Sequence, residues 1–591
     1  MTVTAPRHGR TRPVVRPPGA GDLPAPPTDA ELYAYLGPQR RWVLVATDVA
    51  FVATMASLLV FTLRSWAFWP FLVFFALSVV GAVLSTASGL RRRRVSRADH
   101  EARLLLWPAG RAADDHPSVD VFLPTAGEPL TLLENTYRHV AALRWPGVLR
   151  VHVLDDADRP EVADAARAHG FVHHVRANRG ELKKAGNLHA AYQRTDGDLV
   201  VVLDADFCPR PDLLDHLVPS FDDPTVGIVQ SPQVFDTTAR MGWVQRTAGA
   251  AQELFYRWIQ PSRDAVGAAI CVGTSAVYRR TALDANGGFA RIAHSEDVYT
   301  GLQLQEHGYG LCYVPVQVSK GVCPDTTDSF LNQQYRWCLG AMSLLASRDF
   351  HRMAMTGRQR VAHWAGFLFY VTTALGVFLG ELPGLVVLAT DPRSVHPWAY
   401  LALLPAVWVR LVLVPGTSTT VWRFEVLRVQ LLYSLTHVVA IVDTLRRREA
   451  AWVPTSAAVS ARRRGGVPVR VARLGVVWLT TLLAGLVAAL ARATVTVGIG
   501  QVWVAGLLVA LFAYVAVPVV VELWPLARGR VARPAVSPRS RARARARAGR
   551  RGASEHHLDR PLAWPESVAW TAVVVLVAIV ASGQVHTVPL V

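Results

Sequence analysis

Residues that could handle a charged, phosphorylated substrate are gathered in five short motifs between Asp155 and Trp337. In chain order the motifs are Asp155-Asp156, Lys184-Ala185-Gly186-Asn187, Asp204-Ala205-Asp206, Ser295-Glu296-Asp297 and Gln333-Gln334-Tyr335-Arg336-Trp337. Carboxylates one residue apart suit a divalent cation, and a guanidinium pairs well with phosphate oxygens. A buried carboxylate can take a proton, and an indole offers an apolar face. The set therefore indicates catalysis rather than structure alone.

Alternating apolar strands and helices should carry the first motifs. Val119 to Leu123 is expected to be a buried strand, and Pro129 to Leu143 the helix that follows it. The run 151–154 would deliver Asp155 and Asp156 at its end, and the run 200–203 would deliver Asp204 and Asp206. Ligands bind at the carboxyl ends of parallel strands, so both acidic pairs are predicted to share one crevice. Helix caps or solvated turns would explain one pair alone.

The order and spacing of the five motifs, which end in Gln-x-x-Arg-Trp, resemble those of the processive family-2 glycosyltransferases, and cellulose synthase catalytic subunits are similar members. The resemblance implies a GT-A-like α/β nucleotide-sugar domain inserted in a polytopic α-helical membrane bundle. It also implies a UDP-sugar donor, a growing polysaccharide acceptor and Mg²⁺ or Mn²⁺. The expected reaction is inverting transfer from UDP-glucose to a β-linked glucan that leaves through the protein's own helices.

The resemblance also implies a role for each motif residue. Asp297 would be the general base, which takes the proton of the acceptor hydroxyl. The remaining assignments are donor nucleotide binding by Asp155, Asp156 and Lys184, metal binding by Asp204 and Asp206, and acceptor or diphosphate binding by Glu296, Gln333, Arg336 and Trp337. The stretch Ile270-Cys271-Val272-Gly273-Thr274 matches the family's acceptor segment only at its glycine and hydroxyl residue.

Composition indicates a membrane protein. Of the 591 residues 51% are hydrophobic, and these gather in long runs. Because about twenty apolar residues span a bilayer, seven spans are predicted. They lie near 42–64, 68–90, 362–382, 398–416, 471–492, 498–522 and 566–587. Basic residues lie beside these runs, so the net charge of +18 reflects positive-inside topology and not nucleic-acid binding.

These patterns predict six regions. They are a disordered basic leader (1–41), two transmembrane helices (42–90), a cytoplasmic glycosyltransferase domain (91–345), interface helices with four transmembrane helices and a cytoplasmic loop near 417–468 (346–526), an Arg-rich cytoplasmic segment (527–564) and a final transmembrane helix (565–591). The expected location is the inner membrane, in contact with the lipid bilayer and with accessory polysaccharide-export subunits. The Arg-rich segment is too short for a β-barrel that binds cyclic di-guanylate.

Three other functions remain open from the sequence. A synthase of another β-glycan, for example one based on N-acetylglucosamine, would use the same motifs. A lipid-linked sugar transferase without secretion would need the membrane helices only as an anchor. A transporter or inactive scaffold would explain the helices but not the acidic motifs.

Overall fold

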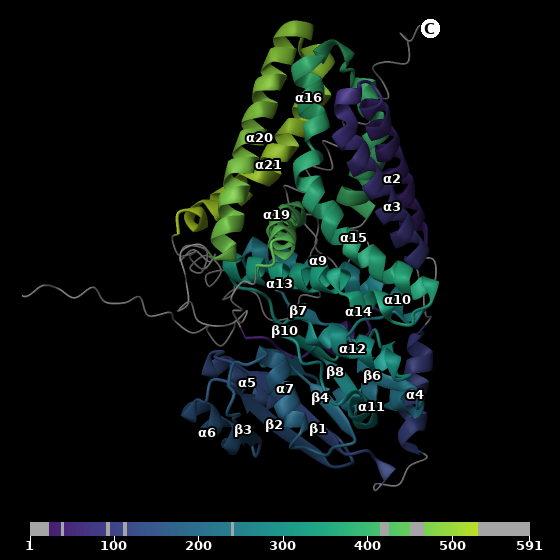
Figure 1. Ribbon diagram of the computed structural model, residues 1–591, viewed down its shortest axis with the longest axis vertical. Coiled ribbons are helices and arrows are strands. Elements are labelled where there is room, and N and C mark those ends of the chain that lie inside the picture. The colour runs from purple at the N-terminus through teal and green to yellow at the C-terminus, as the bar shows by residue number, and fades with distance from the viewer. Residues whose placement is uncertain are drawn as a thin grey trace, which may run out of the picture.

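The computed structural model describes residues 23–36, 41–89, 95–109, 115–237, 241–413, 425–448 and 466–529. In Figure 1 a bundle of long helices stands above an α/β domain, and α9 (Trp243–Leu254), α13 (Thr327–Ala346) and α19 (Glu425–Leu445) lie between them. The predicted final helix, and the Arg-rich segment beyond residue 529, fall outside the described residues. The architecture that the family resemblance implied, an α/β domain joined to a bundle of long apolar helices, is confirmed.

The α/β domain is built on a seven-stranded sheet with the order β3-β2-β1-β4-β8-β6-β9. Its strands are β1 (Val119–Thr125), β2 (Leu149–Asp155), β3 (Val172–His174), β4 (Leu199–Val202), β6 (Val226–Gln230), β8 (Ala276–Arg279) and β9 (Gly310–Tyr313). Because helices cover both faces, β4 and β6 are buried along their whole length, which explains their continuous apolar sequence. The helices of the domain include α5 (Leu130–Val140), α6 (Pro160–Ala168), α7 (Lys183–Tyr192), α11 (Arg280–Asn286) and α12 (Glu296–Glu306).

The sheet is mixed: the strands that carry the two acidic pairs are parallel, as expected, but one strand runs in the opposite direction. Strands β1 to β4 pair in parallel, whereas β8 runs antiparallel to both β4 and β6. The chain enters β8 at Ala276, which pairs with Val202 and Gln230 at the carboxyl ends of those strands. The chain therefore enters β8 from this edge, whereas before a parallel strand it would first have to cross to the opposite edge of the sheet. This reversal leaves the residues just before Ala276 at the same edge as the acidic motifs.

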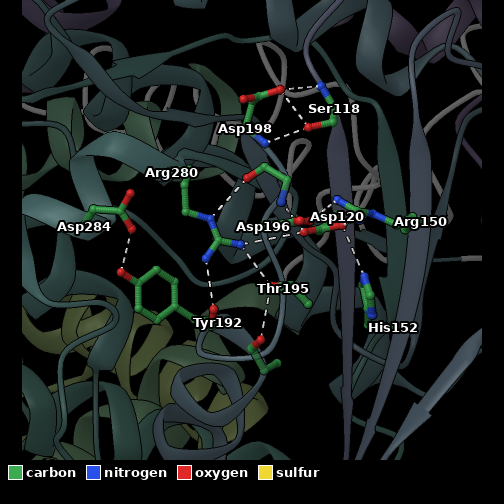
Figure 2. Close-up of polar contacts among 12 residues, drawn as sticks. Ser118, Asp120, Arg150, His152, Tyr192, Thr195, Asp196, Asp198, Arg280 and Asp284 are labelled. Atoms are coloured by element: carbon green, nitrogen blue, oxygen red, sulfur yellow. Dashed lines mark hydrogen bonds and ion pairs between the residues drawn. The ribbon is translucent and has the colours of Figure 1, made fainter.

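The opposite edge of the sheet is closed by a cluster of charged groups around Asp120 (Figure 2). The Asp120 carboxylate has no exposed surface, and it accepts hydrogen bonds from Arg150 Nε at 2.9 Å, His152 Nε2 at 3.2 Å and the amide of Gly197 at 2.7 Å. A buried carboxylate is tolerated when its lone pairs are satisfied in this way. Burial alone would raise the pKa of Asp120, but these partners lower it below its ordinary value. The cluster therefore stabilises the sheet and leaves the carboxyl edge for the chemistry.

A three-stranded sheet and an N-terminal segment flank the domain. The small sheet contains β5 (Phe207–Pro209), β10 (Ser319–Val322) and β7 (Val234–Asp236). Residues 23–36, which include α1 (Asp29–Leu32), bury Leu32 and Tyr35, and Glu31 lies 3.2 Å from Lys320 Nζ. This part of the predicted leader, 1–41, is thus ordered.

Six helices in the described part of the chain are long and apolar enough to cross a membrane. They cover Val43–Thr62, Trp66–Gly89, Gly357–Thr390, Glu425–Leu445, Val467–Val497 and Ile499–Ala527. Five correspond to predicted spans, and Glu425–Leu445 lies in the region that was expected to be a cytoplasmic loop, near 417–468. The span predicted at 398–416 is instead the shorter helical run Pro397–Leu413, in which Pro397 and Pro405 start separate short helices.

Polar contacts tie the α/β domain to the long helices. Arg246 on α9 donates two hydrogen bonds of 2.8 Å to the carboxylate of Glu425, the first residue of α19. The Thr327 hydroxyl at the start of α13 donates to Glu522 Oε1 at 2.6 Å, on α21 (Ile499–Ala527). Both contacts involve charged groups that are only partly exposed, where they are stronger than on an open surface. The catalytic domain and the bundle are therefore held in one relative orientation at the level of α13.

Candidate functional site

The strand ends gather the predicted acidic residues at one edge of the sheet. Thr125 and Asp155 are the last residues of β1 and β2 and lie opposite each other in the register. Asp204 follows β4, which pairs with the other side of β1. As the sequence predicted, both acidic pairs are delivered to the same edge by parallel strands.

Asp155 and Asp156 are already bound by the protein itself. Asp155 is fully buried and accepts hydrogen bonds from the amides of Ala157 at 3.0 Å and Arg159 at 2.7 Å. Asp156 accepts hydrogen bonds from Arg176 Nε at 2.6 Å and Arg176 Nη2 at 2.8 Å, and also from the amide of Gly180. Their direct contribution is to hold the turn after β2 and the loop that leads into α7.

Lys184, near the start of α7, reaches across to the next motif. Its Nζ lies 2.5 Å from Asp204 Oδ1 and 2.7 Å from the carbonyl oxygen of Gly273. Burial would lower the pKa of Lys184, but Asp204, Glu296 and Asp297 raise it above its ordinary value. Lys184 is therefore a permanent positive charge in the crevice, beside the carboxylates predicted to hold metal.

Asp206 lies close to other carboxylates, so its surroundings carry an excess of negative charge. Burial raises the pKa of its carboxyl to about 8, and the neighbouring carboxylates of Asp204 and Glu128 contribute in the same direction. A bound cation reverses such a shift, because it favours the ionised form. The oxygen donors of Asp204 and Asp206 therefore fit a hard divalent ion. Within the described ranges, no group of three or more His, Cys, Asp or Glu side chains is arranged as a metal cluster, so the protein would supply only part of the coordination.

The predicted base, Asp297, sits in the first turn of α12. Burial raises its pKa to about 7, and Glu296 adds to the shift while Lys184 opposes it. The amide of Val298 donates to Asp297 Oδ1 at 2.8 Å. Gly273 approaches so closely that a Cβ atom there would lie 2.9 Å from Asp297 Oδ2. A carboxylate with a pKa near neutrality is suited to accept a proton.

The α13 helix brings the last motif to the same crevice. Burial lowers the pKa of Arg336, while the charges of Asp204, Glu296 and Asp206 act in the opposite direction. Gln333 is buried, and its Oε1 has no hydrogen-bond partner among the residues that the structure describes. Trp337 is half-buried on the same helix. A Cβ atom at Gly340 of the same helix would collide with Ser295, so α13 packs against the loop that leads to Glu296 and Asp297. Gln333 has an acceptor available for a ligand.

Three residues of the site were not predicted as site residues. Glu128 accepts from the amide of Ala126 at 2.8 Å and adds negative charge beside Asp206. Arg176 holds Asp156, and the Thr274 hydroxyl accepts a hydrogen bond from the amide of Asp204 at 3.0 Å. The sequence could have indicated Glu128 as a site residue, because it lies only three residues after Thr125, the last residue of β1. Arg176 and Thr274 depend on contacts between distant segments.

The comparisons with known proteins place the chain in a family. Residues 199–517, more than half of the chain, match the family model described as Glycosyl transferase family group 2. The chain belongs to this family and is a glycosyltransferase with a membrane helical bundle. The predicted resemblance to cellulose synthase-like members is confirmed.

The most informative relatives are bacterial. The chain is 34% identical over 257 residues to the cellulose synthase catalytic subunit (UDP-forming) of Xanthomonas axonopodis pv. citri (strain 306), covering 42% of this chain and 35% of that protein. It is 31% identical over 307 residues to the protein of the same name from Pseudomonas fluorescens (strain SBW25), covering 50% of this chain and 40% of the relative. The chain therefore spans well under half the length of these relatives.

Solved structures are more distant. A mannosyltransferase from Pyrobaculum calidifontis in complex with GDP-Man and Mn²⁺ is 19% identical, with a TM-score of 0.42. That match covers 63% of this chain and 100% of the mannosyltransferase.

Proposed function

We propose that this protein is a processive, inverting glycosyltransferase that extends a β-glucan from UDP-glucose and passes the product through its own membrane helices. One observation carries the proposal: Lys184 Nζ contacts both Asp204 Oδ1 and the carbonyl oxygen of Gly273. A Cβ atom at Gly273 would lie 2.9 Å from Asp297 Oδ2, so a cation, a predicted metal ligand and the predicted base meet in one crevice. Glycosyl transfer needs positive groups that stabilise the departing diphosphate and a group that accepts the proton of the acceptor hydroxyl. The crevice has groups of both kinds.

The donor's diphosphate would lie among the positive charges of the crevice. Lys184 and Arg336 can donate to its oxygens and stabilise the charge that grows as the glycosidic bond breaks. Asp204 and Asp206 would hold Mg²⁺ or Mn²⁺, which neutralises the leaving diphosphate. Asp155 and Asp156 would act by positioning the two loops that contact the uracil and ribose. This assignment refines the expectation that both carboxylates touch the nucleotide directly.

Asp297 would start the transfer. Its carboxylate accepts the proton of the terminal hydroxyl of the glucan, and the hydroxyl oxygen forms a bond to the anomeric carbon. The bond between that carbon and the diphosphate breaks on the opposite face, so UDP leaves and the configuration inverts. Glu296 raises the proton affinity of Asp297, and the close approach of Gly273 limits how the carboxylate can turn.

The acceptor chain would be held by the last motif. The Trp337 indole offers a flat apolar face on which a pyranose ring can stack. Gln333 Oε1, which is buried and has no partner within the described ranges, can accept a hydrogen bond from a sugar hydroxyl. Both lie on α13, between the catalytic domain and the long helices (Figure 1). We propose that the growing chain enters the bundle here, with the α/β domain in the cytoplasm and the helices in the inner membrane. Accessory export subunits would then act on the far side.

Donor and product can be tested together. Membranes that contain the protein are incubated with labelled UDP-glucose, UDP-N-acetylglucosamine or other UDP-sugars, and the product is digested with linkage-specific glycanases. The expected result is a long polymer from UDP-glucose that a β-glucanase degrades, and no polymer from the Asp297→Asn variant. A polymer from another UDP-sugar would identify a different β-glycan synthase. Label confined to lipid would indicate a lipid-linked sugar transferase, and no transfer from any donor would favour a non-catalytic role.

A further inference from the structure

Tyr335 lies inside the last motif, but its side chain serves a different purpose from those of its neighbours. The side chain is 3% exposed, and its hydroxyl donates a hydrogen bond of 2.8 Å to Asp443 Oδ2. Asp443 belongs to α19, more than 100 residues along the chain. Tyr335 therefore connects the motif helix to the membrane part of the protein.

The carboxylate that accepts this bond is itself fixed. Asp443 is 1% exposed and receives both arms of Arg470, which lies on α20 (Val467–Val497): Nη1 is 2.7 Å from Oδ1 and Nη2 is 2.5 Å from Oδ2. A bidentate guanidinium sets the plane as well as the position of a carboxylate. The Tyr335 hydroxyl can thus reach its acceptor in only one rotation of α13.

The other side of α13 faces the chemistry. Arg336 follows Tyr335 by about 100° around the helix, and Gly340, four residues after Arg336, lies on nearly the same face. A Cβ atom at Gly340 would collide with the side chain of Ser295, the residue just before Glu296. The face that bears Arg336 is therefore pressed against the loop that carries the predicted base. Tyr335 holds the helix from the membrane side.

We propose that Tyr335 is a positioning residue for sugar transfer: its hydrogen bond to the Asp443–Arg470 pair sets the rotation of α13 and thereby the placement of Arg336 at the diphosphate. The proposal rests on the proposed function of the crevice. A rotation of α13 by about 20° would move a side-chain tip some 7 Å from the axis by roughly 2 Å, and errors of about 1 Å already slow well-oriented reactions strongly.

The conservative variant Tyr335→Phe keeps the packing and removes only the hydroxyl. Its expected effect is a fall in kcat of about 10-fold, with the KM for the sugar nucleotide within about 2-fold of the parent, because the loops that would bind the nucleotide are untouched. Arg470→Lys, which keeps the charge but loses the bidentate contact, should give a smaller fall of the same kind. Tyr192→Phe is the matched control, since it also removes a hydroxyl that donates to an aspartate, here Asp284 at 2.6 Å (Figure 2).

A double-mutant cycle separates positioning from simple stability. If Tyr335 acts through Arg336, then Arg336→Lys should cost at least about 3-fold less in the Tyr335→Phe background than in the parent, because the guanidinium is already misplaced. Hydrogen exchange of the α13 amides should also be faster in Tyr335→Phe than in Tyr192→Phe. The proposal is overturned if the fold-losses of the two single variants simply multiply in the double variant. It is also overturned if hydrogen exchange in α13 is unchanged, or if the kcat of Tyr335→Phe equals that of Tyr192→Phe.

The reference rate is release of the nucleoside diphosphate by the parent protein, with the sugar nucleotide that it uses best. A parent that prefers a donor other than UDP-glucose would count against the proposed function and leave the cycle valid. The exchange measurement needs no turnover at all. Failure of the donor assignment and failure of the positioning role therefore give different results.

Discussion

Lys184 and Asp204 form an ion pair across the crevice, with Nζ 2.5 Å from Oδ1. The sequence motifs assign the two residues to different tasks, donor binding and metal binding. Their contact means that a divalent cation at Asp204 would share the carboxylate with Lys184 or release Lys184 toward the diphosphate. The charge of the crevice is thus arranged for a ligand that brings both a metal ion and phosphates.

Cation dependence should follow from this pair. Excess EDTA should abolish sugar transfer, and Mg²⁺ or Mn²⁺ should restore it. Lys184→Gln should lower kcat by about 10²-fold, because a donor to the diphosphate is lost, yet it should also lower the cation concentration needed for half activity. Lys183→Gln is the control, and both quantities should stay near the parent values. Full activity in EDTA would show that Asp204 and Asp206 do not hold a metal ion that the reaction needs.

The base assignment predicts a specific pH profile. Burial raises the pKa of Asp297 to about 7, so the ionised base is lost as the pH falls through about 7, and kcat should fall with it. Asp297→Asn should lower kcat by about 10² to 10⁴-fold and leave donor binding nearly unchanged. Its residual rate should lack the inflection near pH 7. Parallel loss of donor binding and transfer would give Asp297 a binding role instead.

The raised pKa of Asp297 also affects the free energy of unfolding, which should fall with rising pH where kcat rises. Because the pKa of Asp297 is higher in the folded protein than its ordinary value of 3.8, its contribution to the free energy of unfolding is present below about 4 and is lost as the pH rises through about 7. Asp297→Asn should therefore reduce the fall in thermal stability between these pH values. An unchanged profile would show that the carboxyl is not held in a raised state.

Gly273 provides a steric test of the site. It has a positive φ of 75°, and a Cβ atom would lie 2.9 Å from Asp297 Oδ2. Gly273→Ala should lower kcat by at least about 10²-fold, because the base must move. Gly170→Ala is the control, since its φ of 74° carries the same backbone strain but no atom of the described residues lies within 4 Å of the added carbon. If both variants lose stability alike, by about 1 kcal/mol, and keep the parent rate, Gly273 does not position Asp297.

Trp337 should govern the length of the product. Stacking of an indole on the terminal sugar is worth about 1–3 kcal/mol, comparable with an aromatic contact, and would act on the acceptor but not on the donor. Trp337→Ala should shorten or abolish the polymer while hydrolysis of the UDP-sugar continues, and Trp337→Phe should keep part of the activity. Polymer of normal length from Trp337→Ala, measured by gel filtration, would leave Trp337 only as an interfacial anchor.

Membrane topology decides the role of α19. Reporter fusions after Arg94, Arg448 and Gly529 should register as cytoplasmic, and a fusion after Asp391 as external. α19 is apolar enough to span, but more than half of it is buried inside the protein, and Arg246 fixes its first residue to the catalytic domain. For Asp391 to be external and Arg448 cytoplasmic, exactly one of Pro397–Leu413 and α19 must cross the bilayer. If both cross, or neither does, the Arg448 fusion will be external.

The sequence by itself determined the acidic edge and most of the apolar helices. Asp155 and Asp204 each follow a short apolar run, and parallel strands bring such run ends together whatever the rest of the fold does. The long spans near 42–64 and 471–522 were predictable for a similar reason, because length and hydropathy alone meet the demand of a bilayer. These properties are local, or they repeat along the chain.

Only the tertiary structure decided how the site residues are paired. Arg176 binds Asp156, Gly273 approaches Asp297, and Tyr335 faces Asp443 rather than the crevice. The antiparallel entry of β8 places Gly273 at the site, and no pattern in the sequence distinguishes that direction. Each of these contacts joins segments that lie far apart along the chain. Packing of whole elements selects them, and that packing depends on shape and charge that no short motif contains.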